Sequence, residues 1–193
     1  MRKPLTREAI LDAAIEILDR DGMTGLSMRK LGSAVGVEAM SLYNHVPNKE
    51  ALLDGIHERI LLSLDSPTHT RTWQAFVRHQ ALALHRALQA HPNAISLFAT
   101  RPASTAAAMD RLIRYLEVLE TAGFKAIDRL SIVQLVAQLV VGHAMWTTNV
   151  DIAIDPDVKA PKHVTKALEK WDPDRELELG IDALIHGFEQ LLA

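Results

Sequence analysis

The sequence predicts an all-α protein with a small N-terminal head and a larger C-terminal helical bundle. Apolar residues recur at the three- and four-residue spacing of helices along most of the 193 residues, and no segment alternates like a strand. Glycine and proline fall mainly where these helical runs stop. We expect helices at 6–21, 28–35, 39–45, 48–64, 72–90, 93–99, 104–121, 127–148 and 174–192, and an irregular segment at 151–173 with a short helix at 163–170.

The first helix, 6–21, is strongly amphipathic. Thr6 can cap its N-terminus, and Gly22 is placed to end it. Its apolar stripe consists of Ile10, Ala13, Ala14, Ile17 and Leu18. A helix of this length packs across the two shorter helices that follow it, which predicts a three-helix head.

Residues 26–53 hold two short helices with a glycine between them, followed by a proline and the start of a third helix. Ser27 can cap the first of these helices, Gly36 allows the left-handed turn, and Pro47 ends the second helix. This order is typical of a helix-turn-helix, which presents its second helix to the major groove of DNA. A helical hairpin without a nucleic acid partner is the alternative, because helix-glycine-helix units are common.

The second of these helices, 39–45, is too short and too polar to lie in a core. Only Leu42 and one side of Tyr43 need to face inward. The outer side then carries the hydrogen-bonding groups and small apolar surfaces that bases and phosphates accept. The outward residues are Ala39, Met40, Ser41, Asn44 and His45.

Residues 6–53 resemble the DNA-binding part of the tetracycline-repressor (TetR) family of bacterial transcriptional regulators. The resemblance is most specific in the run Gly36-Val37, Ser41-Leu42-Tyr43-Asn44-His45-Val46, Asn48-Lys49 and Leu52-Leu53. It implies DNA contacts from Arg29, Met40, Ser41, Tyr43, His45 and Lys49. Met40 and Ser41 match base or phosphate positions, and Lys49 matches a lysine that attracts a phosphate at a helix N-terminus. Tyr43 as a core-edge aromatic residue and His45 as a solvated one remain alternatives, and Asn44 stands where the family often has tryptophan or phenylalanine.

Charge and composition exclude several classes of protein. Residues 1–65 contain eight Lys and Arg and ten Asp and Glu, a formal charge of −2, although 26–49 carry a local +2. This balance favours specific binding by a dimer over a nonspecific coating protein, which needs a strongly basic surface. The lack of cysteine excludes disulfides and thiolate metal sites and fits a cytoplasmic location. No signal region precedes the first helix, and the longest apolar run, 130–145, is broken by Gln134, Gln138 and His143, so we expect no membrane segment.

The C-terminal part also resembles the tetracycline-repressor branch of the family, at Trp73-Gln74, Phe76, His91, Thr100-Arg101-Pro102 and Gly123-Phe124. The resemblance implies a helical ligand-binding and dimerisation domain. The metal-binding histidines of that branch fall here on Asp65 and on Leu97 or Phe98. His79, His85 and His91 cannot replace them, since a spacing of six puts neighbours on opposite sides of a helix. We therefore expect neither a metal nor a cofactor, and no tetracycline specificity.

A ligand pocket in this bundle would be lined by residues on the inward faces of its helices. The candidates are Phe76, Gln80, Leu84, Leu97, Phe98, Thr100, Ile113, Leu116, Val136, Leu139 and His143. For each of them, plain core packing is the alternative. Because these candidates are mostly apolar and no basic residue clearly points inward, we expect a largely apolar effector that is neutral or cationic.

The last two long helices are candidates for a homodimer interface. Residues 130–145 are apolar almost all round, which indicates burial on more than one side. The final helix carries a heptad seam of Leu177, Ile181, Leu184, Phe188 and Leu191. Such helices suit a four-helix interface across a two-fold axis, and the alternative is an intramolecular core. A symmetric dimer predicts a palindromic operator.

The sequence therefore predicts a ligand-responsive repressor that binds operator DNA as a homodimer. We divide it into a DNA-binding domain at 1–47, a connecting helix at 48–66 and a ligand-binding and dimerisation domain at 67–193, and we expect a bound effector to tilt the connecting helix. A helical ligand carrier or enzyme whose head no longer binds DNA is the alternative of another class. The sequence offers no Ser/His/Asp set, carboxylate pair or phosphate loop for catalysis. A constitutive DNA-binding protein with a filled core is a third hypothesis.

Overall fold

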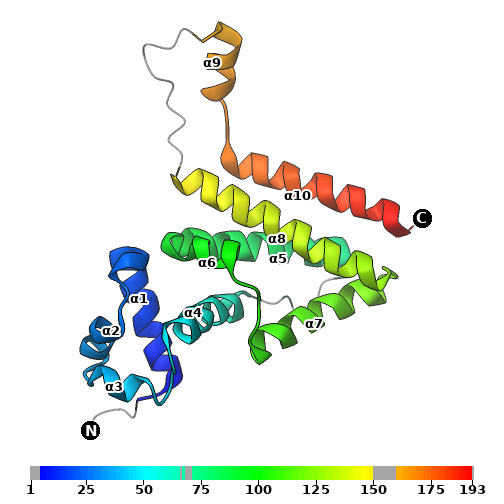
Figure 1. The fold of residues 1–193 in the computed structure, drawn as a ribbon. Coiled ribbons are helices and arrows are strands. Elements are labelled where there is room, and N and C mark those ends of the chain that lie inside the picture. The colour runs from blue at the N-terminus through cyan, green and yellow to red at the C-terminus, as the bar shows by residue number, and fades with distance from the viewer. Residues whose placement is uncertain (1–4, 66, 68–70, 150–159, 193) are drawn as a thin grey trace.

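The computed structural model describes residues 5–65, 67, 71–149 and 160–192. These residues form helices and no strand, as the sequence predicts (Figure 1). The helices are α1 (Arg7–Gly25), α2 (Met28–Val35), α3 (Ala39–Leu42), α4 (Lys49–Ser63), α5 (Trp73–Ala90), α6 (Ile95–Thr100), α7 (Ala106–Thr121), α8 (Ala126–Asn149), α9 (Lys162–Leu168) and α10 (Pro173–Glu189), with the short 3-10 helices η1 (Pro92–Ala94) and η2 (Gln190–Leu192).

The head consists of α1, α2 and α3, and the starts of α1, α2 and α4 follow the expected capping. The side chains of Thr6, Ser27 and Asn48 each accept a hydrogen bond from the backbone N–H three residues later, at 3.2, 3.3 and 2.8 Å. Gly36 adopts a left-handed conformation with φ of +74° after α2. The predicted caps and the glycine turn are therefore confirmed.

Two helix ends differ from the prediction. Gly22 has φ of +69° and kinks α1 without ending it, because helical geometry resumes and continues to Gly25. Helix α3 ends at Leu42, three residues early, because the N–H groups of His45 and Val46 both donate to the carbonyl of Leu42 and close a tight turn. The short helix expected at 163–170 is found as α9, while 151–159 lie outside the described residues.

The molecule has two hydrophobic cores. The head core gathers residues of α1 to α4, such as Ile10, Leu42 and Ile56, together with Ala94 and Leu97 from the body. The body core is built from α5, α7, α8 and α10. Phe98 on α6 packs against both cores. Short segments around η1 and α6 thus join the head to the body.

Helix α4 lies between the head and the body, and α5, α8 and α10 lie side by side at the other end of the molecule (Figure 1). Helix α9 stands away from the bundle and contains no buried residue. Within Ala126–Thr148, α8 is long and apolar enough to span a membrane by length and mean hydropathy. Its packing against α5, α6, α7 and α10 fits the central helix of a bundle.

The predicted heptad seam on α10 points into the body and not outward. Leu177, Ile181 and Phe188 are buried in the body core of a single protomer, and Leu184 packs against that core. Only Leu191 of the predicted set is exposed. The assignment of this seam to a dimer interface is wrong for the buried residues, because a heptad pattern marks an apolar helix face without showing which neighbour covers it.

Candidate DNA-binding surface and effector cavity

Helix α3 is held against α2 by close backbone contact. A Cβ atom placed on Gly32 would lie 2.9 Å from the carbonyl oxygen of Val37 and 3.1 Å from the backbone nitrogen of Ala39. Only glycine fits there, so the two helices approach more closely than any side chain permits. Leu42 and Val46 are fully buried beneath α3 and fix its orientation. The outer side of α3 is thereby presented to solvent.

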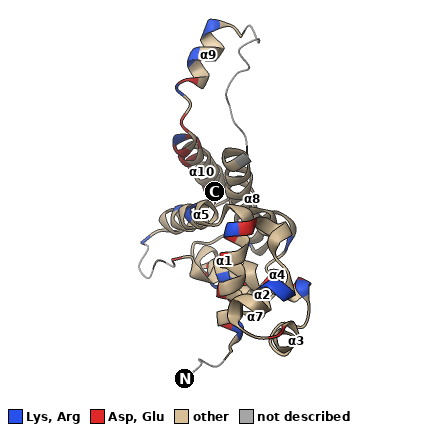
Figure 2. Ribbon diagram, turned by 90° about the vertical axis from the view of Figure 1, so that its left-hand side faces the viewer, with Lys and Arg blue, Asp and Glu red and all other residues tan. Residues whose placement is uncertain are grey.

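The structure places the predicted DNA contacts around this outer side. Met40 is 73% exposed and Tyr43 is 41% exposed. Arg29, Asn44 and Lys49 are also exposed, and Ala39, Ser41 and His45 are half-buried. Lys49 begins α4, where the capped helix N-terminus adds its partial positive charge. Basic residues are few on the ribbon around α2 and α3 (Figure 2). Arg29 and Lys30 on α2 are adjacent there, and Lys30 is paired with Asp21 at 2.7 Å.

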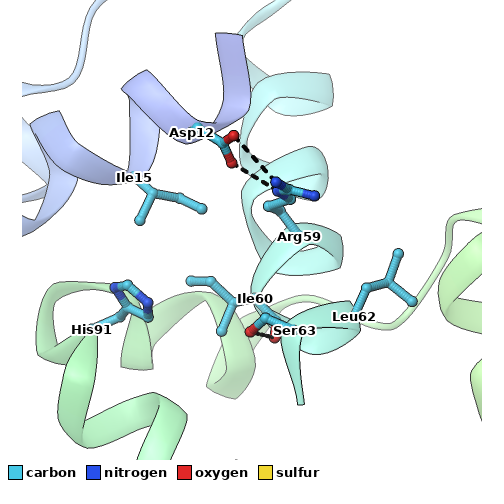
Figure 3. Close-up of a pocket in the computed structure, with 7 residues that line it drawn as sticks. All are labelled: Asp12, Ile15, Arg59, Ile60, Leu62, Ser63 and His91. Carbon is cyan, nitrogen blue, oxygen red and sulfur yellow. Dashed lines mark hydrogen bonds and ion pairs between the residues drawn. The ribbon is translucent and has the colours of Figure 1, made fainter. Parts of the chain in front are cut away.

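Ion pairs connect α4 to the head. Arg59 on α4 donates to Asp12 on α1 at 2.7 and 3.1 Å, and Arg7 donates to Glu58 at 2.7 Å. Figure 3 shows the Asp12–Arg59 pair on the wall of an open groove that also contains Ile15 and Ile60. Any displacement of α4 therefore acts on α1 through charged as well as apolar contacts.

The end of α5 makes a second junction with the head. His91 lies on the opposite wall of the groove in Figure 3. Its Nδ1 atom is 2.8 Å from Oδ2 of Asp19 on α1. The side-chain amide of Asn93 donates to the carbonyl oxygens of Leu18 and Asp19, both at 3.0 Å. This junction satisfies backbone groups of α1 just before the kink at Gly22.

The body contains a cavity of about 220 Å³ bounded by α4, α5, α6, α7 and α8. Its wall is mostly apolar with a few polar groups, which is the usual composition of a small-molecule site. The lining residues are His57, Leu61, Leu64, Gln80, Ala81, Leu84, Phe98, Arg101, Pro102, Ala103, Ala108, Arg111, Leu112, Tyr115, Val133, Gln134, Val136, Ala137 and Val141.

Three polar side chains of this wall are Gln80, Arg111 and Tyr115. The Arg111 guanidinium donates to Gln80 Oε1 at 2.6 Å and to the backbone carbonyl of Leu64 at 3.3 Å. The Tyr115 hydroxyl is buried and lacks a hydrogen-bond partner among the described residues, and burial raises the pKa of Tyr115. Its ring meets Phe76 edge-on, with ring centroids 4.9 Å apart. The cavity thus contains hydrogen-bonding capacity that a bound molecule can use.

Arg101 connects the cavity to α4. Its side chain lines the cavity and donates to Asp54 at 2.6 Å and to Glu50, both on the first turns of α4. His57, one turn further along α4, is buried in the same wall and meets Phe98 edge-on at 4.4 Å between ring centroids. Burial lowers the pKa of His57, which keeps this side chain neutral near pH 7.

Four of the predicted pocket residues border the cavity: Gln80, Leu84, Phe98 and Val136. The others lie elsewhere. Leu97 is buried in the head core, the Thr100 hydroxyl donates to the Ser96 carbonyl, and Phe76 lies behind Tyr115. Ile113 is 45% exposed and Leu116 is half-buried on the outer side of α7. Leu139 packs against Gly180, and His143 Nε2 lies 2.9 Å from the Pro173 carbonyl, facing His85.

The face of α7 that lines the cavity is not the predicted face of Ile113 and Leu116. The inward residues are Ala108, Arg111, Leu112 and Tyr115. With the fully buried Leu119, they follow a helical spacing that was available in the sequence. The premise that no basic residue points inward is therefore wrong, because Arg101 and Arg111 both line the cavity.

A helix-turn-helix head joined through one helix to a bundle with a cavity defines the class of ligand-responsive, DNA-binding transcriptional regulators. The chain belongs to the TetR family of bacterial regulatory proteins. The family model for its DNA-binding part matches residues 10–56, and that of the tetracycline repressor-like C-terminal domain matches residues 66–163. Proteins of this family are regulators and not enzymes.

The relatives support the same assignment along the whole chain. The class D tetracycline repressor of Escherichia coli is 32% identical over 97% of this chain and 88% of its own length. The TetR family protein ActR of Streptomyces coelicolor, in complex with (S)-DNPA, is 26% identical with a TM-score of 0.81 and 98% of each chain covered. A TetR variant of Acinetobacter baumannii AYE, in complex with minocycline, is 25% identical with a TM-score of 0.80, and the match covers 98% of this chain and 96% of that one. The chain is accordingly a ligand-responsive transcriptional regulator.

Proposed function

We propose that the protein is a cytoplasmic repressor that binds a palindromic operator as a homodimer and leaves it when a small effector fills the cavity. The observation that carries the proposal is the position of Arg101, which lines the cavity and is ion-paired with Glu50 and Asp54 on α4. Lys49 begins α4, which is the next helix after α3 along the chain. A ligand that moves Arg101 would therefore move the helix that sets the position of the DNA-binding surface.

The proposed DNA contacts are divided into two kinds. Met40 and Ser41 on α3 would read base edges, while Tyr43 and Lys49 would bind phosphates. Arg29 on the neighbouring α2 would strengthen the phosphate contacts. Ala39, Asn44 and His45 complete the surface.

The proposed dimer interface is the outer face of α8 and α10. Its large apolar residues that are exposed in the protomer include Leu135, Trp146 and Leu179. Leu179 is 69% exposed in the protomer, which is costly for a large apolar side chain on a monomer surface when its neighbours are also apolar. Gly142 lies on the same face, with open space where a Cβ atom would stand, and would allow close approach of a second helix pair. The operator is expected to be palindromic because a two-fold dimer presents two α3 helices.

Selection of binding sites from a random DNA pool by the purified protein tests the DNA-binding half of the proposal. We expect a palindrome with half-sites spaced by about one helical turn or slightly more. Enrichment of an asymmetric site, or no enrichment, would contradict the proposal.

The coupling between cavity and head is tested with Asp54→Asn and Glu50→Gln, because neither residue lines the cavity. Compounds that raise the melting temperature of the parent protein should still do so in these variants, whereas their release of operator should weaken. Release should persist in EDTA, since the proposed effector needs no metal. Asp182→Asn, which removes the partner of Arg78 within the body, is the matched control and should leave release unchanged. Unaltered release in the α4 variants would show that Arg101 does not transmit the signal.

A further inference from the structure

The head is attached to the body at two separate places. At the first, Arg59 on α4 donates to Asp12 on α1. At the second, residues 91–94, from the end of α5 to η1, contact α1, and we call this place the η1 junction. Figure 3 shows the Asp12–Arg59 pair and His91 on opposite walls of one groove. Two bodies joined at one place can still turn about it, whereas a second, separate attachment fixes the angle between them.

The η1 junction holds α1 by its backbone. The side-chain amide nitrogen of Asn93 donates to the carbonyl oxygens of Leu18 and Asp19, both at 3.0 Å. His91 Nδ1 lies 2.8 Å from the Asp19 carboxylate, and Ala94 is fully buried in the head core. Because backbone carbonyls cannot move independently of their helix, these bonds fix where α1 lies relative to the body.

The kink in α1 explains why one of these carbonyls can accept from the body. In a regular helix the Asp19 carbonyl accepts from the backbone N–H of Met23. Gly22, which precedes Met23, has φ of +69° and ψ of −179°, so the N–H of Met23 no longer points along the helix. A Cβ atom on Gly22 would meet nothing within 4 Å, so the positive φ, and not close packing, calls for glycine. The kink thus leaves the Asp19 carbonyl open to the Asn93 amide.

The two attachments differ in their relation to the effector cavity. Helix α4 contributes His57, Leu61 and Leu64 to the cavity wall. None of residues 91–94 is among the described residues that line this cavity. A ligand in the cavity therefore touches the first attachment directly and has no direct contact with the η1 junction.

We propose that the η1 junction sets the angle of each head relative to the dimer body, and that Asn93 is the positioning residue by which it determines the half-site spacing of the operator. This inference rests on the proposed function and specifies how its DNA-binding surfaces are placed. Adding one base pair between two half-sites moves them apart by about 3.4 Å and rotates one relative to the other by about 35°. A dimer with fixed heads therefore discriminates between spacings, whereas one with loosely held heads accepts several.

Asn93→Ala tests the inference on DNA. The variant should fold, because Asn93 is exposed and its truncation leaves no buried cavity. Operators with the half-site sequence selected by the parent are compared at the selected spacing and with one base pair added or removed at the centre. The ratio of affinities between the selected and the altered spacing should fall about fivefold or more in Asn93→Ala, while the preferred half-site sequence stays the same. A ratio equal to that of the parent would overturn the inference, since a merely structural role lowers stability without relaxing the spacing.

Two further variants assign the effect to the η1 junction. Gln74→Ala is the matched control, because the Gln74 amide donates to Glu189 at 3.0 Å within the body, and it should keep the spacing preference of the parent. His91→Ala removes the contact with Asp19 and leaves Asn93 in place, so it should relax the spacing to a smaller extent. Equal relaxation in Gln74→Ala would indicate a general loosening of the protein and contradict the assignment.

A distance between the two heads gives an independent reading without DNA. The chain has no cysteine, so Ala34→Cys, at an exposed position on α2, takes one spin label per protomer. Double electron–electron resonance should show a distance distribution at least about twofold broader in Asn93→Ala than in the labelled parent, and unchanged in Gln74→Ala. Equal widths in the parent and Asn93→Ala would refute the inference. Failure of the parent to select a palindrome would contradict the proposed function, whereas a palindrome whose spacing Asn93→Ala still requires would contradict only the present inference.

Discussion

The head core and the body core differ in how completely they are filled. In the head, six large side chains of α1, α2 and α3 are at most 1% exposed: Ile10, Leu11, Ile17, Leu18, Leu31 and Leu42. The body encloses the cavity, and four of its buried polar atoms lack a hydrogen-bond partner in the described part of the chain, at His85, Tyr115, Arg129 and His143. In the described part of the head, one buried side-chain oxygen, Oδ1 of Asp19, lacks a hydrogen-bond partner.

This difference matches the two tasks of the regulator, which are to hold α3 in a fixed position and to respond to a ligand. A filled core has one arrangement, because close-packed side chains transmit strain and tolerate little change in volume. It therefore holds α3 at a fixed position relative to α1 and α2. A core with a cavity and spare hydrogen-bonding groups changes its energy when a ligand occupies it, which is the requirement for effector control.

The largest expected effect comes from placing charge inside and outside the body core on the same helix. Phe188→Asp should lower the free energy of unfolding by several kcal/mol, because Phe188 is 5% exposed and its replacement buries an unpaired carboxylate. Leu179→Asp should leave the protomer folded and yield monomers, since Leu179 lies on the outer face of α10. Circular dichroism and light scattering distinguish the two results. A folded Leu179→Asp dimer of unchanged size would move the interface to another surface.

Equivalent truncations compare the two cores directly. Leu42→Ala should cost about 2–5 kcal/mol of unfolding free energy, as for a leucine in a filled core. Leu84→Ala should cost less, since Leu84 already borders the cavity and makes fewer contacts there. Urea denaturation measures both. Equal losses would remove the distinction between a filled and an unfilled core.

The elements predicted from sequence alone were those that depend on local chemistry. Thr6, Ser27 and Asn48 cap their helices, and Gly36 turns the chain, because these residue types satisfy backbone groups or adopt positive φ whatever surrounds them. The exposed side of α3 was also predictable, since Leu42 is its one strongly apolar residue.

The residues that were missed depend on which neighbour covers a helix face. Leu177 and Phe188 form a real apolar stripe, yet α5 and α8 cover it within the protomer, which the period of the pattern does not show. Arg111 was missed because a charged residue on an amphipathic helix is usually solvated. Here the side-chain carbonyl of Gln80 on α5 and the backbone carbonyl of Leu64 at the end of α4 accept hydrogen bonds from the Arg111 guanidinium inside the bundle.

A smaller effect is expected at the DNA-binding surface. Lys49→Ala should weaken binding about equally on all DNA sequences and reduce the salt slope by roughly one per half-site, because it removes one phosphate contact. Met40→Ala should instead change the preferred bases, since Met40 projects from α3. Binding-site selection and salt titrations on the selected site test the pair. The same change in both variants would contradict the division into phosphate and base contacts.

The smallest expected effect is a dependence of stability on pH that originates in the body. Burial lowers the pKa of His85, with a further contribution from His143, which faces it, and from Arg86, while Asp174 acts in the opposite direction. The unfolded chain therefore binds a proton at His85 at higher pH than the folded protein does. The contribution of His85 to the free energy of unfolding should be constant above the ordinary histidine pKa of about 6.5 and fall as the pH decreases from there to the lowered folded-state value.

Urea denaturation at pH 7.5 and 5.5 should show this loss in the parent, and His85→Leu should reduce it. His186→Gln, at an exposed position on α10, is the matched control and should keep the loss of the parent. An undiminished loss in His85→Leu would assign the pH dependence to other groups, with the buried His57 beside the cavity as the next to substitute.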